Sequence, residues 1–405
     1  MELPGNSITN YIFPNNYEIW WSILIVIYPY ITGLIAGAFI VSTLSHLFRI
    51  KEFDNIANFS LVTAFCFGCF AGVPLLFHLG QPQRALEIFI TPHWTSPMSI
   101  FGYVYFTYMI LLAVEIWLIY RPFFIRRANE TEGSGLVGYV WYAMTLGVTT
   151  YHPDSLRADK KISAILTGLG IPWAFALHGY VGFIFGSVKA IAMWGTPLQP
   201  VVFILSAIVS GMAMLLLMYT FIAWRTKMPF EYPMIRKFML ILWGVFLIDI
   251  SLEILELAFH KYELDRQWEN LEPLMYGPLW ETLIVGQFLI LSLIPFLVLG
   301  FISLFHPKDK MTLFLANLAC LMIVLQVLLM RYNVVIGGQL ISKSERGFVE
   351  FHWDFFSREG VFMAAAIFIA PFVLYYVISR VIPIFDSPAY EPEDDEATEP
   401  HTPAP

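Results

Sequence analysis

Nine long apolar blocks constrain the fold of this chain more than any other feature of its sequence. Each holds about 20 mostly apolar residues, the length that a helix rising about 1.5 Å per residue needs to cross a hydrocarbon core of about 30 Å. The blocks do not alternate between apolar and polar residues, as membrane β-strands would. The sequence therefore predicts an all-α integral membrane protein with nine transmembrane helices. They are expected at 20–47, 56–79, 97–120, 163–190, 200–224, 237–259, 279–305, 311–331 and 360–381.

The composition excludes a soluble enzyme and a disulfide-rich scaffold. Of the 405 residues, 58% are apolar and 13% are charged, whereas a soluble domain carries about 25% charged residues. Three cysteines are too few for a small disulfide-bonded fold. A polytopic membrane protein remains.

The segment 136–150 is apolar but shorter than a span, and the polar stretch 152–161 follows it. We interpret it as an interfacial or re-entrant piece and keep a tenth transmembrane helix as the alternative. Residues 1–16 are polar and lack a basic region, so they do not resemble a cleavable signal peptide.

The distribution of Lys and Arg predicts the orientation in the membrane. With nine spans, fifteen of the 23 cationic residues fall on the side that receives the first connecting loop. Cytoplasmic loops carry the excess of Lys and Arg. We therefore expect a multi-pass protein of the cytoplasmic (inner) membrane, with its N-terminus outside and its C-terminus in the cytoplasm.

The chain divides into three compositional zones. We expect an external N-terminal segment at 1–17, a transmembrane domain at 18–385 and an acidic cytoplasmic tail at 386–405. The tail has seven acids, five prolines and no Lys or Arg, so it cannot bury a core and is predicted to be disordered. It either increases solubility or docks onto a basic partner.

The sixth span carries the densest set of ionisable residues. Asp249, Glu253, Glu256 and His260 are spaced 4, 3 and 4 residues apart, which places all four on one face of a helix. Such a stripe cannot face lipid, because each charge at this depth needs a partner or water. It is either a buried network that holds helices together or a face that handles protons or binds a ligand.

Other polar residues are expected at the same depth. The predicted topology places His78, Gln81, Arg84, His178, Arg331 and Asn333 in the outer half of the membrane, near Glu253, Glu256 and His260. A convergence of His, Glu and Arg suits a molecule that changes protonation as it changes redox state. Taken singly, each histidine is equally explained as a hydrogen bonder between helices.

Three further polar residues lie within spans. Glu115 either ends a proton path from the cytoplasmic side or extends toward Arg121, and we favour the second interpretation. Gln287 and Asn317 are expected to form hydrogen bonds between helices rather than to belong to a site.

Motifs for resident cofactors are missing from the sequence. The pair Cys66 and Cys69 lacks the following histidine of a c-type haem site and is interpreted as packing. No four-cysteine cluster, P-loop or dinucleotide glycine pattern occurs. A bis-histidine haem between His78 and His178 is a weak alternative. We therefore expect this chain to bind no haem and no iron–sulfur cluster.

Several stretches resemble a known family. YITGLIAGA at 30–38 resembles the small-residue opening helix of the NrfD/PsrC family, the membrane subunit of polysulfide-reductase-type complexes. HLGQPQR at 78–84, followed by Pro92 and Ser96-Pro97, is similar to its signature after the second helix. HGYVGFIFG at 178–186, RYNVVIGGQ at 331–339 and SREG at 357–360 look closest to the DsrP subunit of the sulfite-reduction-associated DsrMKJOP complex. Hydrogenase (HybB-like) membrane subunits share much of this pattern.

The resemblance implies a cofactor-free, quinone-reactive subunit of a respiratory or sulfur-metabolism complex in anaerobic respiration. Menaquinone would be its substrate and an outer-face iron–sulfur protein its electron partner. A multiheme cytochrome c and further membrane and cytoplasmic redox subunits would complete the complex, with no nucleic-acid partner. By motif, the family's site residues carry over to His78, Gln81, Arg84, His178, Arg331 and Asn333. The carboxylates of the sixth span are assigned on spacing alone.

These observations lead to a hypothesis for the site. The quinone headgroup would be held by His178 and His78, with Glu256 or Glu253 taking the proton and Arg331 or Arg84 steering the oxyanion. Asn333, Asp249, His260 and Gln81 would supply further substrate contacts. The alternatives are a HybB-like hydrogenase subunit, a proton- or ion-coupled transporter that uses the stripe from Asp249 to Glu256, a structural anchor and a haem-bearing cytochrome b. Proton translocation stays open.

Overall fold

The computed structural model describes residues 18–131, 134–150, 152–191, 193–264, 266–342, 345 and 347–385. The predicted N-terminal segment 1–17 and acidic tail 386–405 lie outside the described residues. Within them the chain is helical, and β-structure is limited to two isolated bridges, Glu18 with Glu350 and Ile341 with Phe348.

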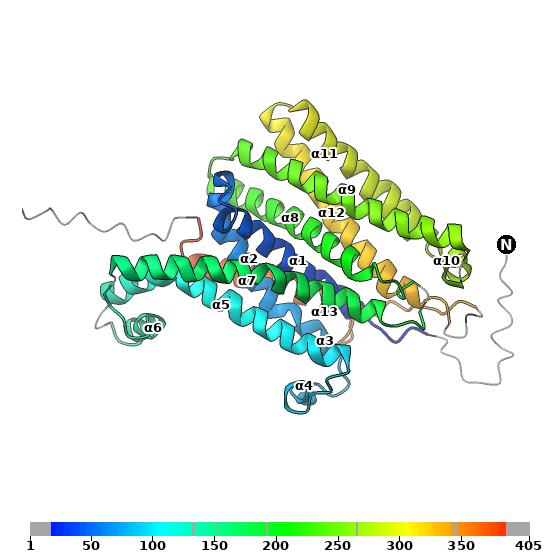
Figure 1. The fold of residues 1–405 in the computed structure, drawn as a ribbon, viewed down its shortest axis with the longest axis horizontal. Coiled ribbons are helices and arrows are strands. Elements are labelled where there is room, and N and C mark those ends of the chain that lie inside the picture. Colours follow the sequence, from blue (N-terminus) through cyan, green and yellow to red (C-terminus); the bar gives the residue numbers. More distant parts are fainter. Residues whose placement is uncertain are drawn as a thin grey trace, which may run out of the picture.

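Nine helices in the described part of the chain are long and apolar enough to cross a membrane, which confirms the predicted fold class. They form one elongated bundle with the two described ends of the chain at opposite ends (Figure 1). The spans are α1 (Ile23–His46), α2 with α3 (Asp54–Ala71 and Val73–His78), α5 (Pro97–Glu130), α7 (Pro153–Gly186), α8 (Gln199–Thr226), α9 (Tyr232–Glu263), η4 with α11 (Trp280–Leu293 and Ile294–Phe305), α12 (Asp309–Val335) and α13 (Val361–Val381).

The shorter elements connect the spans near the ends of the bundle. They are η2 (Lys51–Phe53), η3 (Pro82–Arg84), α4 (Glu87–Ile90), α6 (Leu136–Met144), α10 (Arg266–Tyr276) and η5 (Gly337–Gln339). The expectation of a short piece rather than a tenth span at 136–150 agrees with α6, which has nine residues.

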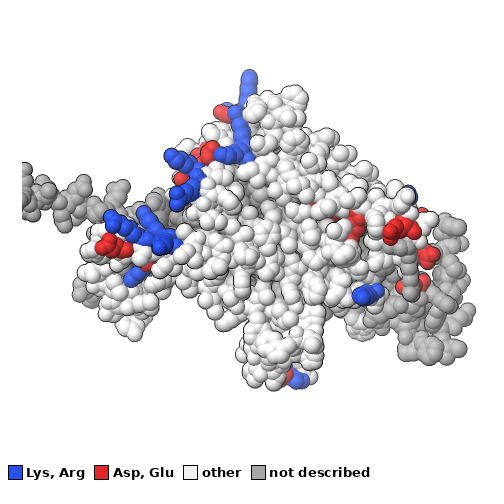
Figure 2. Space-filling view, viewed as in Figure 1, with Lys and Arg blue, Asp and Glu red and all other residues white. Residues whose placement is uncertain are grey.

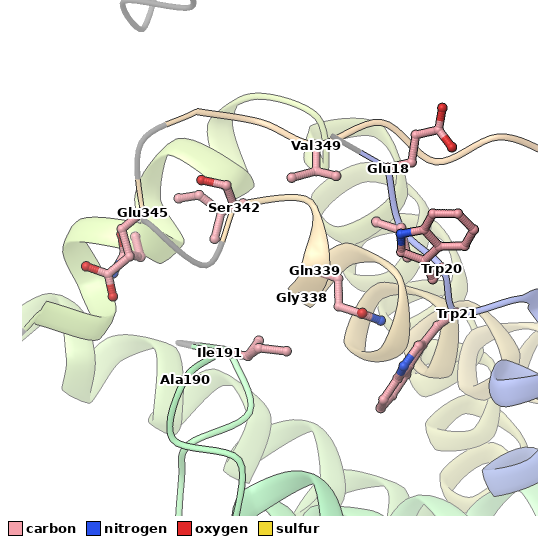
Figure 3. A pocket seen from close by; sticks show the side chains of 13 residues that line it. Glu18, Trp20, Trp21, Ala190, Ile191, Gly338, Gln339, Ser342, Glu345 and Val349 are labelled. Atoms are coloured by element: carbon pink, nitrogen blue, oxygen red, sulfur yellow. The ribbon is translucent and has the colours of Figure 1, made fainter. Parts of the chain in front are cut away.

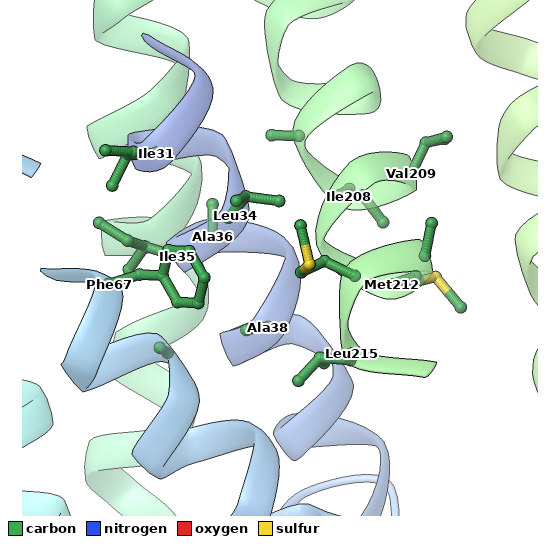
Figure 4. Packing of buried hydrophobic residues seen from close by; sticks show 14 of the residues in the cluster. Ile31, Leu34, Ile35, Ala36, Ala38, Phe67, Ile208, Val209, Met212 and Leu215 are labelled. Atoms are coloured by element: carbon green, nitrogen blue, oxygen red, sulfur yellow. The ribbon is translucent and has the colours of Figure 1, made fainter. Parts of the chain in front are cut away.

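Helix α1 is the centre of the bundle. It is buried over nearly its whole length and packs against α2, α7, α8, α12 and α13. Its apolar side chains interlock with Phe67 of α2 and with Ile208, Met212 and Leu215 of α8 (Figure 4).

Small residues set the distance between α1 and α8. A Cβ atom added to Gly37 would collide with the α8 backbone at Ala207 and Gly211, and one added to Gly211 would collide with Gly37. Close approach of this kind is the usual way in which helices associate in lipid. The small-residue stretch of the first span is therefore a packing surface.

Helices α5 and α7 extend about ten residues beyond the spans expected from hydropathy, because their inner ends stabilise each other. Arg121 of α5 forms an ion pair with Asp159 of α7 at 3.0 Å, and both side chains are largely buried. Arg121 also lies over the ring of Trp117. The polar stretch 152–161 is thus part of a helix rather than a loop.

Lys and Arg side chains gather at one end of the bundle (Figure 2), the end where α6 lies in Figure 1. The other end carries more Asp and Glu on the face shown in Figure 2. This asymmetry matches the cation bias on which the predicted orientation rests.

Candidate functional site

Arg331, near the C-terminal end of α12, is fully buried and joins three helices. Its Nη2 lies 3.1 Å from Nε2 of His178 on α7 and donates to Oγ of Ser206 on α8 at 2.6 Å. The guanidinium lies 3.8 Å above the ring of Phe203. A cation at this depth needs such partners, because water is not there to solvate it.

Two carboxylates of α9 face this cation. Asp249 is fully buried and Glu253 nearly so, and both interact electrostatically with Arg331. Neither oxygen of Asp249 has a hydrogen-bond partner among the described residues. When all three groups are ionised, one cation and two carboxylates carry a net charge of −1. One bound proton makes the group neutral, so it is a place where a proton can be held inside the bundle.

A chain of amides continues from Glu253. Gln287 donates from Nε2 to Oε2 of Glu253 at 2.9 Å and accepts at Oε1 from Nδ2 of Asn333 at 2.8 Å. Gln287 lies in η4, a 14-residue π-helix, a form that frequently occurs at functional sites. We call these residues the Arg331 cluster. Its members are His178, Ser206, Asp249, Glu253, Gln287, Arg331 and Asn333.

A recess opens beside the cluster, between α9, α10, η4, α12 and the loop before α8. Its volume is about 70 Å³. Its polar wall contains Glu253, Glu256, His260, Thr196, Gln199, Gln287 and Asn333. Its apolar wall contains Met193, Val202, Leu257, Leu271, Leu283, Phe288, Met330 and Val334.

Three polar atoms on the walls of this recess lack partners among the described residues. They are Oε1 of Glu253, Oδ1 of Asn333 and Nε2 of Gln199. Buried polar atoms are nearly always hydrogen bonded, so unpartnered ones require an explanation. Glu256 lies on the same wall, with Thr196. The recess therefore presents both acceptors and a donor to whatever enters it.

The structure brings most of the predicted stripe together. Glu253, Glu256 and His260 line the same recess, while Asp249 lies one turn deeper and faces Arg331. The spacing argument did not identify Thr196, Gln199 and Ser206. Gln287 was expected to bond between helices, and it does, yet it also belongs to the wall of the recess. A polar residue inside an apolar span was the available signal for Ser206 and Gln287.

His178 lies behind the recess rather than on its wall. It is fully buried, and its Cε1 would be 3.2 Å from a Cβ atom added to Gly33 of α1. Its Nδ1 has no hydrogen-bond partner among the described residues. Like its partner Arg331, His178 is not on the wall of the recess, and a direct contact with a ligand in the recess is not part of this geometry.

His78, at the end of α3, and Gln81 and Arg84, at η3 just after it, have partners of their own in two separate sets of contacts. Nδ1 of His78 lies 2.5 Å from Oε2 of Glu359 and 3.3 Å from Oγ of Ser22. Arg84 is exposed and holds Glu87 through two bonds of 2.8 and 2.7 Å, which keeps the pKa of that carboxyl below its usual value. We call the two sets together the His78 group: Ser22, His78, Gln81, Arg84, Glu87 and Glu359.

The predicted convergence of all the outer-half residues therefore needs correction. The side-chain contacts link His78 to Ser22 and Glu359, and Arg84 to Gln81 and Glu87, whereas His178, Arg331 and Asn333 have other partners among the described residues. Equal depth in the membrane does not make two residues neighbours, because the connecting helices can lie on different sides of the bundle.

Aromatic rings fill the space between the N-terminal end of α1 and the cluster. Trp21 stacks on Trp194 with centroids 5.1 Å apart, and Trp194 donates from Nε1 to the carbonyl of Val334 at 2.5 Å. A separate hollow of about 110 Å³ lies outside Trp21, between 18–21, 190–191 and the loop 338–349 (Figure 3). Gly338 permits this arrangement, since a Cβ there would lie 2.6 Å from the Trp194 nitrogen.

The remaining polar residues have local partners. Glu115 accepts a hydrogen bond from Thr167 at 2.5 Å, so the favoured extension toward Arg121 is wrong; Arg121 forms its ion pair with Asp159 instead. Asn317 accepts from Thr220 of α8 at 2.6 Å, as an interhelical bond predicts. In the described part of the chain, no group of three or more His, Cys, Asp or Glu residues could hold a metal ion.

The fold and site define a class: a multi-pass helical membrane protein with a charged cluster buried beside an outer recess. Residues 13–343 match the family described as polysulphide reductase, NrfD. The chain belongs to this family, as its motifs predicted.

Three relatives extend the comparison. A selenate reductase subunit of Mesobacillus selenatarsenatis is 31% identical over 78% of this chain and 73% of its own length. A protein of Halobacterium salinarum assigned as a dimethyl sulfoxide reductase membrane subunit is 29% identical over 48% of this chain and 42% of its own length. The Hdr-like menaquinol oxidoreductase integral membrane subunit of Archaeoglobus fulgidus is 24% identical over 56% of this chain and 49% of its own length. The chain thus spans less than half the length of the last two. All three are named as subunits of oxidoreductases.

Proposed function

We propose that this chain is the quinone-reactive membrane subunit of a redox complex in the cytoplasmic membrane. It exchanges electrons between menaquinone or menaquinol and an iron–sulfur partner docked on the outer face. Family membership and the menaquinol oxidoreductase subunit among the relatives support this proposal. Electrons leave the chain for that partner, because the sequence carries no motif for an iron–sulfur cluster or a c-type haem.

The observation that carries the proposal is the recess with its unpartnered polar atoms. Oxidation of a quinol releases two electrons and two protons, so a quinol site needs acceptors within hydrogen-bond reach of the ring hydroxyls. Oε1 of Glu253 and Oδ1 of Asn333 are such acceptors. The apolar wall, with Leu257 and Phe288, suits the ring and the start of an isoprenoid tail.

Each residue then has a role. Glu253 or Glu256 accepts the proton, and His260 and Asn333 orient the headgroup. Arg331, balanced by Asp249, lies behind the wall of the recess and stabilises negative charge on the wall residue Glu253 and on the headgroup through its electric field. His178 is a positioning residue that holds Arg331 in place. The proposal gives His78, Gln81 and Arg84 no contact with the headgroup, in contrast to the expectation from sequence.

The finer identity of the complex is part of the proposal. A DsrP-like subunit would have a multiheme cytochrome c and sulfite-pathway subunits as partners, whereas a HybB-like subunit would have a nickel–iron hydrogenase. Purification of the native complex and identification of its subunits separates the two.

The transporter alternative finds less support in the fold. Paired Gly/Pro interruptions in two halves of the chain would favour it, and Ile171-Pro172 and Ile294-Pro295 are such interruptions, although their positions do not clearly match. Helix α7 runs continuously through Pro172 from Pro153 to Gly186, whereas the seventh span changes from π-helix to α-helix at Ile294. Only one of the two interruptions therefore coincides with a change in the helix.

Two variants of the native complex test the site. Glu256→Gln and His178→Ala are each expected to lower menaquinol oxidation by about 10²-fold or more, the usual scale for a lost proton acceptor or its support. Binding of a quinone analogue to the purified complex should weaken in parallel. Glu87→Gln, in the His78 group, is the matched control and should leave both unchanged. If both test variants oxidise quinol normally, the site assignment is wrong.

A further inference from the structure

A second concave feature lies at the opposite end of the bundle from the quinone recess. It is a groove of about 680 Å³ between the C-terminal halves of α8 and α13. Both helices end there, at the end of the bundle where the Lys and Arg side chains gather. Its lining consists of Met218, Phe221, Ile222, Arg225, Thr226, Phe372, Tyr375, Tyr376, Ser379, Arg380, Ile384 and Phe385.

The groove lies between two helices whose main packing partners differ, although both contact α1. Helix α13 packs against α1 and α2, whereas α8 packs against α1, α7, α9 and α12. The chain after α13 turns inward and forms the floor, where Phe385 stacks on Phe59 at 5.5 Å and Ile384 is buried. Phe221 of α8 and Tyr376 of α13 are more than half exposed, so the walls open toward lipid.

The rim of the groove is cationic. Arg225 lies in the last turn of α8 and Arg380 in the last turn of α13. Arg380 donates to the hydroxyl of Tyr376 at 2.7 Å, and its guanidinium lies 4.9 Å from the centroid of that ring. The hydroxyls of Thr226 and Ser379 belong to the same lining, and no carboxylate of the described residues does.

We propose that this groove binds an anionic phospholipid, with its phosphate between Arg225 and Arg380 and its acyl chains along the apolar walls. The two cations at the membrane boundary match the phosphate of such a lipid, and the apolar walls, which face hydrocarbon, match its acyl chains. Arginine suits phosphate because its planar donors reach two oxygens at once. A soluble anion would leave the walls uncovered.

The acidic tail is the rival occupant. Residues 386–405 follow Phe385 directly and carry seven acids. Such a polar stretch complements the rim but not the apolar walls, because buried charges and amides without partners are costly. The lipid satisfies both, and the site is independent of the proposed quinone chemistry.

Native mass spectrometry of the purified protein, with the subunits that accompany it, tests the proposal. The protein is released from nanodiscs that contain equal phosphatidylglycerol and phosphatidylcholine. Wild type is expected to retain phosphatidylglycerol preferentially. Arg225→Gln/Arg380→Gln should reduce this retention about 30-fold, given the usual contribution of two cations near a membrane surface.

Three comparisons make the result decisive. Arg126→Gln/Arg127→Gln removes two cations from α5 at the same end of the bundle and should retain the lipid as wild type does. Equal retention of both lipids by wild type, or equal loss in both double variants, would overturn the proposal. Deletion of 386–405 should leave retention unchanged; a large increase would show that the tail occupies the groove. Thermal unfolding of each variant verifies that it is folded.

Discussion

The Arg331 cluster and the His78 group are built from the same residue types but in different surroundings. Arg331 is fully buried and bonded to a histidine and a hydroxyl, with two carboxylates nearby. Arg84 is exposed and bonded to the carboxylate of Glu87. Charge interactions are strong where water is absent and weak where it is present. Burial, rather than the residue types, therefore distinguishes a reactive site from a surface ion pair.

The two groups also differ in what they leave unsatisfied. The His78–Glu359 pair bonds directly at 2.5 Å, with each side chain about a quarter to a third exposed. In the Arg331 cluster, oxygens of Asp249, Glu253 and Asn333 have no partner among the described residues. A group with its bonds completed has a structural role, whereas one with free acceptors beside a recess is able to bind a ligand. Three predictions test this contrast.

The largest effect is expected from Arg331→Gln. Loss of the buried cation should lower menaquinol oxidation by about 10²- to 10³-fold. It should also destabilise the fold by about 3–5 kcal/mol, because the facing carboxylates lose their counter-charge. Steady-state kinetics of the native complex and thermal unfolding measure the two effects. Arg331→Lys keeps the charge without the planar fork and should fall between wild type and Arg331→Gln.

Arg84→Gln is the control for that prediction. It removes the same side chain from the His78 group, where water replaces the lost ion pair, and should change neither rate nor stability measurably. A loss of rate comparable with that of Arg331→Gln would mean that the His78 group takes part in the reaction and that the contrast drawn above is mistaken.

A smaller effect is expected from Gly33→Ala. The new methyl group would lie 3.2 Å from Cε1 of His178, so the ring must move and with it the contact to Arg331. Overpacking of this kind costs about 1–3 kcal/mol. The low end of that range, about 1 kcal/mol, corresponds to a loss of quinol oxidation of about fivefold, and this is the loss that we expect. Gly168→Ala on α7, where no atom lies within 4 Å of the added Cβ, should retain full activity. Equal behaviour of the two variants would contradict the positioning role of His178.

The smallest effect is expected from Glu359→Gln, which weakens the bond to His78 without removing volume. The pair is partly solvated, so stability should change by less than about 1 kcal/mol, and quinol oxidation by less than about threefold. Chemical denaturation and the same kinetic assay measure these changes. A tenfold lower rate with an unchanged affinity for the quinone analogue would place His78 on a proton route.

The sequence predicted the number and positions of the spans because hydropathy reports directly on what can lie in lipid. It underestimated α5 and α7, whose polar inner ends are stabilised by the pair Arg121 and Asp159. Hydropathy cannot detect a helix that continues outside the membrane on the strength of one tertiary contact.

The site was predicted in part, and the reason lies in the difference between contacts within one helix and contacts between helices. The spacing from Asp249 to His260 fixes one face of α9, and the structure places Glu253, Glu256 and His260 on the wall of one recess. Which helices meet that face is decided by packing. For that reason the sequence could not separate His78 from His178, or place Gln287 opposite Glu253.

The central position of α1 has a consequence for biosynthesis. This helix is synthesised before α12 and α13, yet it packs against both. Elements emerge from the ribosome in chain order, so the part of the α1 surface that faces α12 and α13 is covered by lipid or by an insertion factor until those helices have entered the membrane. Tyr30 belongs to that part, because its hydroxyl donates to the Val324 carbonyl of α12 at 2.9 Å and its ring lies 5.6 Å from that of Phe368 of α13. A polar hydroxyl of α1 therefore obtains its partner only late in assembly.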